Sequence, residues 1–133
     1  MVIISKKFNI KNNEDVIKIH YEMTNEKLNE ATTIIYYEKR KFIGYAILIE
    51  RPNYVILDWL YGPNYEHKIM EKIETELKKK NIDVIKLKIY IDPKENKDIT
   101  IRRINFYINF GYNIYDIKYL DNGETALSIR KDI

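Results

Sequence analysis

The chain has 133 residues, enough for a single domain with one hydrophobic core, and its 23 basic and 20 acidic residues leave a formal net charge of only +3. With 45% apolar residues, four glycines and three prolines, the composition excludes collagen-like, low-complexity and disordered chains. The absence of cysteine excludes a disulfide scaffold, cysteine-ligated zinc, iron–sulfur clusters and thiol catalysis, and the two histidines argue against a histidine-rich metal centre.

The charge balance and the first residues of the chain bear on partners and location. A protein that binds nucleic acid through its charge would show a larger basic excess, so we do not expect a nucleic-acid partner. In residues 1–7 the apolar residues precede the lysines, which is the reverse of a secretory signal, and no run approaches the ~20 apolar residues of a membrane span. The sequence therefore predicts a cytoplasmic protein with no membrane partner.

The first half of the chain predicts one helix among four strands. A strand is expected over 2–10, and a helix begins near Glu14, where Asn13 is suited to cap it and apolar residues then recur at helical spacing. Three strands follow in close succession, as in an antiparallel meander, over 32–38, 42–50 and 54–61. The last of the three is apolar on both faces, which predicts a central strand.

The next two elements predict a crossover connection. After the break at 62–64, the residues Ile69, Ile73 and Leu77 fall on one face of a helix. A strand over 84–91 then alternates apolar residues with lysines. Because a helix separates this strand from the one before it, the two are expected to pair in parallel.

A last helix and two strands close the chain. The helix is expected over 100–110, with Ile101, Ile104 and Ile108 as its apolar stripe and Gly111 as its C-terminal cap. Strands over 112–120 and 124–131 follow, joined by a hairpin turn at Asn122-Gly123. The prediction is an α/β (α+β) fold with one mixed, mostly antiparallel sheet of about seven strands and about three helices.

The residues Phe106-Tyr107 and Gly111-Tyr112 connect this order to a known family. They resemble the Phe-Tyr-x-x-x-Gly-Phe signature of the GNAT superfamily of acetyl-CoA-dependent N-acetyltransferases. The segment 58–65 is similar to the fourth strand of that family and the turn after it, and 127–132 is similar to its closing strands. The resemblance covers nearly the whole chain in element order, so residues 1–133 are expected to form a single GNAT-like domain.

The resemblance implies transfer of an acetyl group from acetyl-CoA to an amine of a small molecule or a protein. In the family, a slot between the fourth and fifth strands holds the pantetheine arm, which places the backbone of Trp59, Leu60 and Tyr61 beside it. The pyrophosphate would lie on the N-terminus of the following helix, where free amides attract anions. The cofactor-binding residues implied there and in the last helix are Glu66, His67, Lys68, Ile69, Met70 and Thr100.

The resemblance also implies two catalytic residues. Tyr107 would give a proton to the leaving thiolate, and Asp58 would take one from the amine, directly or through water. Each also has a structural interpretation, since Tyr107 could be a core-edge tyrosine with a satisfied hydroxyl and Asp58 could cap a loop or pair with a lysine. His20 is expected to be a partly buried structural histidine rather than a residue of the acceptor cleft.

The phosphate-binding stretch departs from the family pattern, which reads approximately Arg/Gln-x-x-Gly-x-Gly/Ala. Residues 65–71 contain neither glycine nor arginine, and Glu66 stands at the expected basic position. Two functions therefore remain open: an N-acetyltransferase, and a GNAT-fold interaction module that has lost acetyl-CoA binding. An open slot would favour the first, and a slot filled by Ile69, Met70 or Trp59 the second. The sequence identifies no acceptor and leaves a homodimer open.

Overall fold

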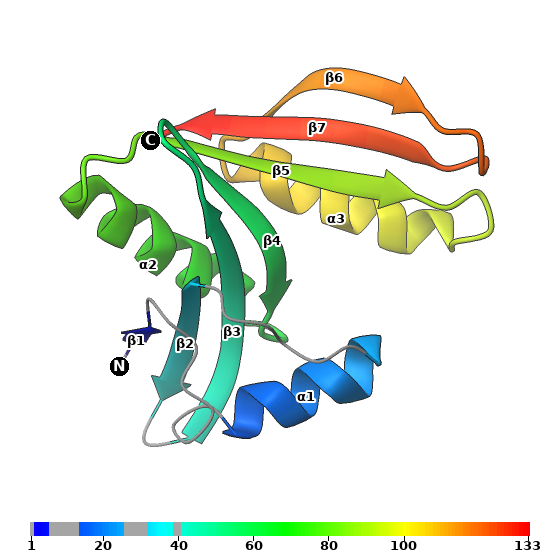
Figure 1. Ribbon diagram of the computed structural model, residues 1–133. Coiled ribbons are helices and arrows are strands. Elements are labelled where there is room, and N and C mark those ends of the chain that lie inside the picture. The colour runs from blue at the N-terminus through cyan, green and yellow to red at the C-terminus, as the bar shows by residue number, and fades with distance from the viewer. Residues whose placement is uncertain (1, 6–13, 26–31, 39–40) are drawn as a thin grey trace.

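The computed structural model describes residues 2–5, 14–25, 32–38 and 41–133, with side chains described for 18–25 and 41–133. The elements follow the predicted order (Figure 1). They are β1 (Val2–Ser5), α1 (Glu14–Thr24), β2 (Thr32–Glu38), β3 (Lys41–Glu50), β4 (Val55–Tyr61), α2 (Glu66–Lys79), β5 (Val84–Ile91), α3 (Lys97–Asn109), β6 (Asn113–Tyr119) and β7 (Thr125–Asp132).

The seven strands form one sheet in the order β1-β2-β3-β4-β5-β7-β6. Every neighbouring pair is antiparallel except β4 and β5, which are parallel because α2 carries the chain back across the sheet. The central position of β4, its parallel pairing with β5 and the Asn-Gly hairpin between β6 and β7 are all confirmed. Gly123, in that hairpin, has φ +87°, which glycine adopts at low cost.

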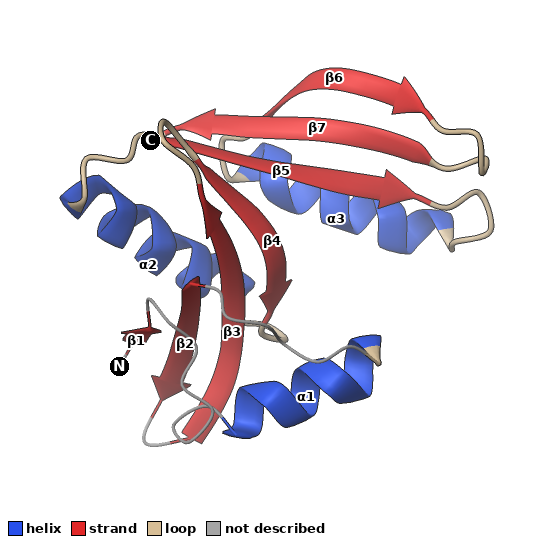
Figure 2. Cartoon of the chain, viewed as in Figure 1, coloured by secondary structure: helices blue, strands red, loops and turns tan. Residues whose placement is uncertain are grey.

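The main core lies between the sheet and the two helices α2 and α3 (Figure 2). Ile69, Ile73 and Leu77 of α2 are buried there, as their spacing predicts. The helix approaches the sheet closely at two glycines. A Cβ added at Gly62 would collide with the Ile69 side chain of α2, and one added at Gly44 would lie 2.9 Å from the same side chain. These two glycines let α2 lie directly on β3 and β4.

The helix α1 covers the opposite face of the sheet. His20 of α1 is 7% exposed, and its Nδ1 lies 2.8 Å from the hydroxyl of Tyr45 on β3. The His20 ring also packs edge-on against Trp59 on β4, with 5.3 Å between ring centres. This burial agrees with the structural interpretation of His20. Asn13, the predicted N-cap of α1, and the second part of the predicted first strand lie outside the described residues.

The structure sets the end of α1 and moves the start of α3 from its predicted place. Helix α1 ends at Thr24, because Asn25 takes a left-handed conformation with φ 59°. Helix α3 begins at Lys97 rather than at Thr100, because the Asn96 side chain caps it by accepting a hydrogen bond of 2.8 Å from the Asp98 amide.

The predicted apolar stripe of α3 is wrong. Ile101 and Ile108 are 53% and 40% exposed, whereas Thr100 is buried and Ile104 and Tyr107 pack against the core. Apolar residues occur all round this helix, so periodicity alone did not fix which face meets the sheet. The end of the helix is as predicted, with Gly111 at φ +98°.

Candidate functional site

The strands β4 and β5 diverge in the middle of the sheet. They pair only at Val55 with Ile85 and at Ile56 with Lys86, and beyond these residues their carboxyl ends point apart (Figure 1). The pairing of β3 with β4 explains the bend, because its register shift leaves Asp58 as an extra residue on β4. Such a β-bulge bends its strand and redirects a side chain, and it is common beside active sites.

A cavity of about 370 Å³ occupies this divergence and is called the β4–β5 slot here. Its walls are Asp58, Trp59 and Leu60 of β4, residues 87–90 of β5, Met23 of α1, and Arg103 and Tyr107 of α3. The side chains of Ile69 and Met70 are fully buried in the main core and do not line the slot. Trp59 lines it while packing on His20, so the slot between the central strands is open.

Tyr107 places a protonated phenol at the slot. Its ring packs edge-on against Phe106 and Tyr112, with ring centres 5.0 and 5.6 Å away. Burial raises the pKa of Tyr107 to about 12, with Arg103 acting in the opposite direction and Glu66 in the same direction as burial. The hydroxyl therefore keeps its proton at neutral pH and can donate it.

Asp58 brings a carboxylate to the same slot. As the bulge residue of β4 it is exposed to solvent. None of the ion pairs found among residues 18–25 and 41–133 includes Asp58. An unpaired, solvated carboxylate at the edge of a cavity is able to accept a proton or bind an ammonium group.

The N-terminus of α2 presents backbone amides without a side-chain cap. Tyr65 is its N-cap residue, and no side chain accepts a hydrogen bond from the first turn. The Tyr65 amide donates to the Gly62 carbonyl over 2.8 Å, and the Ile69 amide donates to the Tyr65 carbonyl over 3.0 Å. By helix geometry, the intervening amides of residues 66–68 have no carbonyl partner within the helix. This helix end can therefore bind an anion.

The side chains around these amides are those of Glu66, His67 and Lys68. The Nε2 atom of His67 lies 2.9 Å from a carboxylate oxygen of Glu71, and its ring packs edge-on against Phe110 at 4.7 Å. Lys68 lies over the Tyr65 ring, 5.3 Å from its centre. Ile69 and Met70 point into the core. The side chains that stand in place of the family's glycines therefore crowd these amides less than the sequence suggests.

Known proteins were compared at the levels of sequence and structure. No family model and no curated protein matches the sequence. Solved structures do match. The ribosomal-protein-S18-alanine N-acetyltransferase from Escherichia coli has a TM-score of 0.70 at 16% identity, covering 100% of this chain and 94% of that one. An aminoglycoside 6'-N-acetyltransferase complexed with coenzyme A has a TM-score of 0.72 at 16% identity, covering 98% and 96%.

A third structure, Arabidopsis thaliana Naa50 in complex with the bisubstrate analogue CoA-Ac-MVNAL, has a TM-score of 0.63 at 14% identity and covers 99% of both chains. The chain has the GNAT fold. The recognition that began with Phe106-Tyr107 and Gly111-Tyr112 is thus confirmed for the fold, which at these identities is what the likeness shows.

The side chains of Thr100 and Tyr61, which the resemblance also implies, lie away from the slot of this GNAT fold. Thr100 is buried in the first turn of α3, where its hydroxyl donates to the Asn96 carbonyl over 3.4 Å. Tyr61 packs against Tyr45 on the α1 side of the sheet, with ring centres 5.9 Å apart. Neither side chain lines the slot, although the Tyr61 backbone lies at the end of β4 that turns away from β5.

The GNAT fold also brings in residues that the sequence did not single out for the site. Lys88 and Tyr90 of β5 line the slot, as does Arg103. The Arg103 guanidinium donates to the Tyr90 carbonyl over 3.1 Å and to the Glu95 carboxylate over 2.9 Å, which fastens α3 to the end of β5. The alternation in 84–91 predicted that Lys88 points away from the core, but it carried no signal that β4 would diverge there.

In the described part of the chain, no three metal-binding side chains of His, Cys, Asp or Glu come together. None of the described helices combines the length and the apolar character that crossing a bilayer requires.

Proposed function

We propose that the protein is an acetyl-CoA-dependent N-acetyltransferase that acts on an amine of a small molecule or a protein. The observation that carries the proposal is the open slot between β4 and β5, with Tyr107 and Asp58 both on its wall. The likeness to an aminoglycoside acetyltransferase complexed with coenzyme A and to Naa50 with a CoA bisubstrate analogue supports the same choice.

The residues of the chain fit acetyl-CoA along the slot and at the N-terminus of α2. Beyond Ile56, the edge of β4 that faces β5 has no strand partner, so the backbone of Trp59, Leu60 and Tyr61 is available to the pantetheine arm. The amides of Glu66, His67 and Lys68 are available to the pyrophosphate. Ile69 and Met70 contribute by anchoring the helix in the core.

Acetyl-CoA supplies an activated acyl group, and residues around the slot accept and donate the protons. The amine nitrogen bonds to the thioester carbonyl carbon, and the carbon–sulfur bond breaks. Asp58 accepts the proton that the amine loses, directly or through water, and Tyr107 gives a proton to the departing sulfur. The products are the acetylated amine and the CoA thiol, so atoms and charges balance.

Calorimetry with acetyl-CoA and CoA tests the proposal. We expect saturable binding of both to the folded protein. If neither binds at millimolar concentration, the transferase proposal is overturned, and the GNAT-fold interaction module becomes the better interpretation.

The variant Glu66→Gln tests where the pyrophosphate lies. It removes a negative charge from the first turn of α2, where the helix dipole favours an anion, so CoA affinity should rise about two- to fivefold. Acetyl-pantetheine lacks the pyrophosphate, so its affinity should not change. A matched control is Glu76→Gln, which makes the same change outside the first turn of α2. An equal effect of Glu66→Gln on the affinities for CoA and for acetyl-pantetheine would place the pyrophosphate elsewhere.

A further inference from the structure

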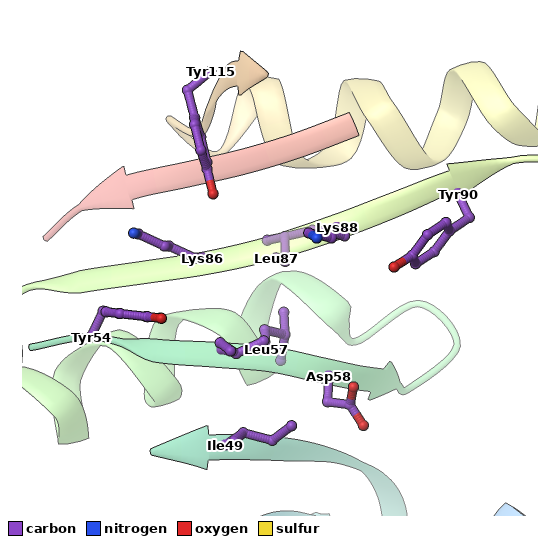
Figure 3. A pocket seen from close by; sticks show the side chains of 10 residues that line it. Ile49, Tyr54, Leu57, Asp58, Lys86, Leu87, Lys88, Tyr90 and Tyr115 are labelled. Atoms are coloured by element: carbon purple, nitrogen blue, oxygen red, sulfur yellow. The ribbon is translucent and has the colours of Figure 1, made fainter. Parts of the chain in front are cut away.

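A second cavity of about 500 Å³ lies beside the slot, and it is called the acceptor pocket here. Its polar side chains come from β4, β5, β6 and the turn that precedes β4 (Figure 3). They are Tyr54 in that turn, Asp58 of β4, Lys86, Lys88 and Tyr90 of β5, and Tyr115 of β6. Lys86 and Lys88 alternate along β5 with Ile85, Leu87 and Ile89 of the main core, so they point to the face of the sheet opposite α2 and α3.

The acceptor pocket adjoins the β4–β5 slot. Leu57, Asp58, Leu87, Lys88 and Tyr90 line both cavities. Asp58 therefore lies where the two cavities adjoin. This is the position that the amine of an acceptor must occupy, since the proposed mechanism assigns its proton to Asp58.

Two lysines make the pocket basic. Lys86 is half-buried, and its Nζ lies 4.2 Å from the centre of the Tyr54 ring and 5.9 Å from that of Tyr115, so both rings hold the cation by cation–π contact. Neither Lys86 nor Lys88 belongs to any ion pair found among the residues whose side chains are described. Against these two cations the pocket holds one carboxylate, Asp58.

The neighbouring charges do not neutralise the two lysines. Arg130 lies directly across from Lys86 on β7, but it is itself paired with Asp132 at 2.8 Å. Asp116 shares a cross-strand row with Lys88, yet Ser128 of β7 lies between them. Like charges on adjacent strands are unfavourable, and an anion bound at Lys86 and Lys88 would relieve this repulsion.

We propose that the acceptor binds in this pocket and that it is an amine carrying an anionic group, a carboxylate or a phosphate. Lys86 and Lys88 bind the anion, and Asp58 binds the ammonium before transfer. Lys86 pairs with Ile56, and Asp58 follows two residues later on the neighbouring strand, so Lys86 and Asp58 are offset by about 7 Å along the strands at ~3.3 Å per residue. The inference rests on the proposed acetyl transfer.

Matched pairs of amines test the preference. In one pair 5-aminopentanoate is compared with 5-aminopentanamide, and in the other 4-aminobutyl phosphate is compared with 4-aminobutanol. With acetyl-CoA, kcat/KM should be about tenfold or more higher for at least one anionic member than for its neutral partner. The pair with the larger ratio identifies carboxylate or phosphate. Equal rates within both pairs, or no acetylation of any probe, would overturn the inference.

Lysine variants locate the effect. Lys86→Met and Lys88→Met keep the aliphatic stem and remove the charge, so each should raise KM for the preferred anionic probe about tenfold and leave its neutral partner unchanged. Lys86→Arg should restore most of the affinity. Lys72→Met is the matched control, because Lys72 is exposed on α2, on the other side of the sheet. Equal losses for both members of a pair would contradict an anion site.

A binding measurement separates this inference from the proposed function. N-acetyl-5-aminopentanoate is titrated into the protein saturated with CoA, which requires no turnover, and the neutral N-acetyl-5-aminopentanamide and the two corresponding acetylated butyl compounds are titrated in parallel. If acetyl-CoA and CoA do not bind at all, the proposed function and this inference fail together. If they bind and neither anionic compound binds more tightly than its neutral partner, only the inference fails.

Discussion

The two edges of β5 differ in how far they are paired. Along the edge that faces β7, all eight residues pair, from Val84 opposite Asp132 to Ile91 opposite Thr125. Along the edge that faces β4, only Ile85 and Lys86 pair. Strand β5 is therefore a rigid wall of the cavity. The bulge at Asp58 bends β4, the opposite wall, away from β5. We call these the paired edge and the open edge.

The helices α2 and α3 differ in whether a side chain caps their N-terminus. The first turn of α3 is capped by the Asn96 side chain. The first turn of α2, near the open edge, has no side-chain cap. Backbone amides are therefore bonded to a side chain at the start of α3 and left available at the start of α2, where a ligand is proposed to bind. Changes at the open edge should therefore affect turnover, and changes beside the paired edge should affect stability.

The largest effect is expected at the open edge, from Tyr107→Phe. Removing the proton donor should lower turnover about 100-fold or more and leave acetyl-CoA affinity nearly unchanged. Steady-state kinetics and calorimetry measure the two quantities. Tyr112→Phe is the matched control, because Tyr112 is 1% exposed and its hydroxyl has no hydrogen-bond partner within the described structure. That variant should keep full turnover and unfold with an equal or higher free energy. Unchanged turnover of Tyr107→Phe would remove Tyr107 from the mechanism.

The largest stability effect is expected beside the paired edge, from Glu74→Gln. Glu74 on α2 pairs with Lys131 on β7 at 2.6 Å, and the Lys131 ammonium also donates to the Phe110 carbonyl at the end of α3 over 2.8 Å. Because the Glu74 and Lys131 side chains are only 11% and 23% exposed, leaving the lysine unpaired should lower the free energy of unfolding by about 2–3 kcal/mol. Urea denaturation measures this.

The control for this variant is Glu76→Gln, which breaks the more exposed pair between Glu76 and Lys79 on the same helix. It should cost less than about 1 kcal/mol. Turnover per folded molecule should be normal in both variants. A loss of turnover per folded molecule in Glu74→Gln alone would contradict the expectation that changes beside the paired edge affect stability and not turnover.

A smaller effect on rate is expected from Asp58→Asn. Because Asp58 is exposed, water can take over part of its role, so kcat/KM for the amine should fall about tenfold with acetyl-CoA affinity unchanged. Asp116→Asn, an exposed change on β6, serves as the control and should leave kcat/KM as it is. The unfolding free energy should not change in either variant. If Asp58→Asn lowered the free energy of unfolding instead, Asp58 would have a structural role and not a catalytic one.

The smallest effect is a pH dependence of stability at the open edge. Burial raises the pKa of Tyr107 to about 12, so above about pH 10 the unfolded chain releases a proton that the folded protein keeps. This contribution is fully present below pH 10 and is lost as the pH rises towards 12. At pH 11 the free energy of unfolding should be about 1 kcal/mol lower for this reason than it is below pH 10. Denaturation at pH 9 and pH 11 should show a smaller decrease for Tyr107→Phe than for the parent protein, and an equal decrease would contradict the raised pKa.

The sequence determined what local chemistry encodes. Periodicity and turn residues predicted the order of the elements, the cap at Gly111 and the hairpin at Gly123, and both glycines have positive φ. The crossover through α2 made β4 and β5 parallel, and the apolar character of β4 made it central. Tyr107 was found because its neighbours form a short local motif.

Only the tertiary structure decided what depends on contacts between distant segments. The bulge that frees Asp58 arises from the register of β3 against β4, and the slot arises because β4 stops pairing with β5 after Ile56. The face that α3 turns to the sheet, and the meeting of Lys86 with Tyr54 and Tyr115, depend in the same way on packing between elements. Local propensity fixes what each segment becomes, whereas the shape of a cavity is set by how segments far apart in the chain pack against one another.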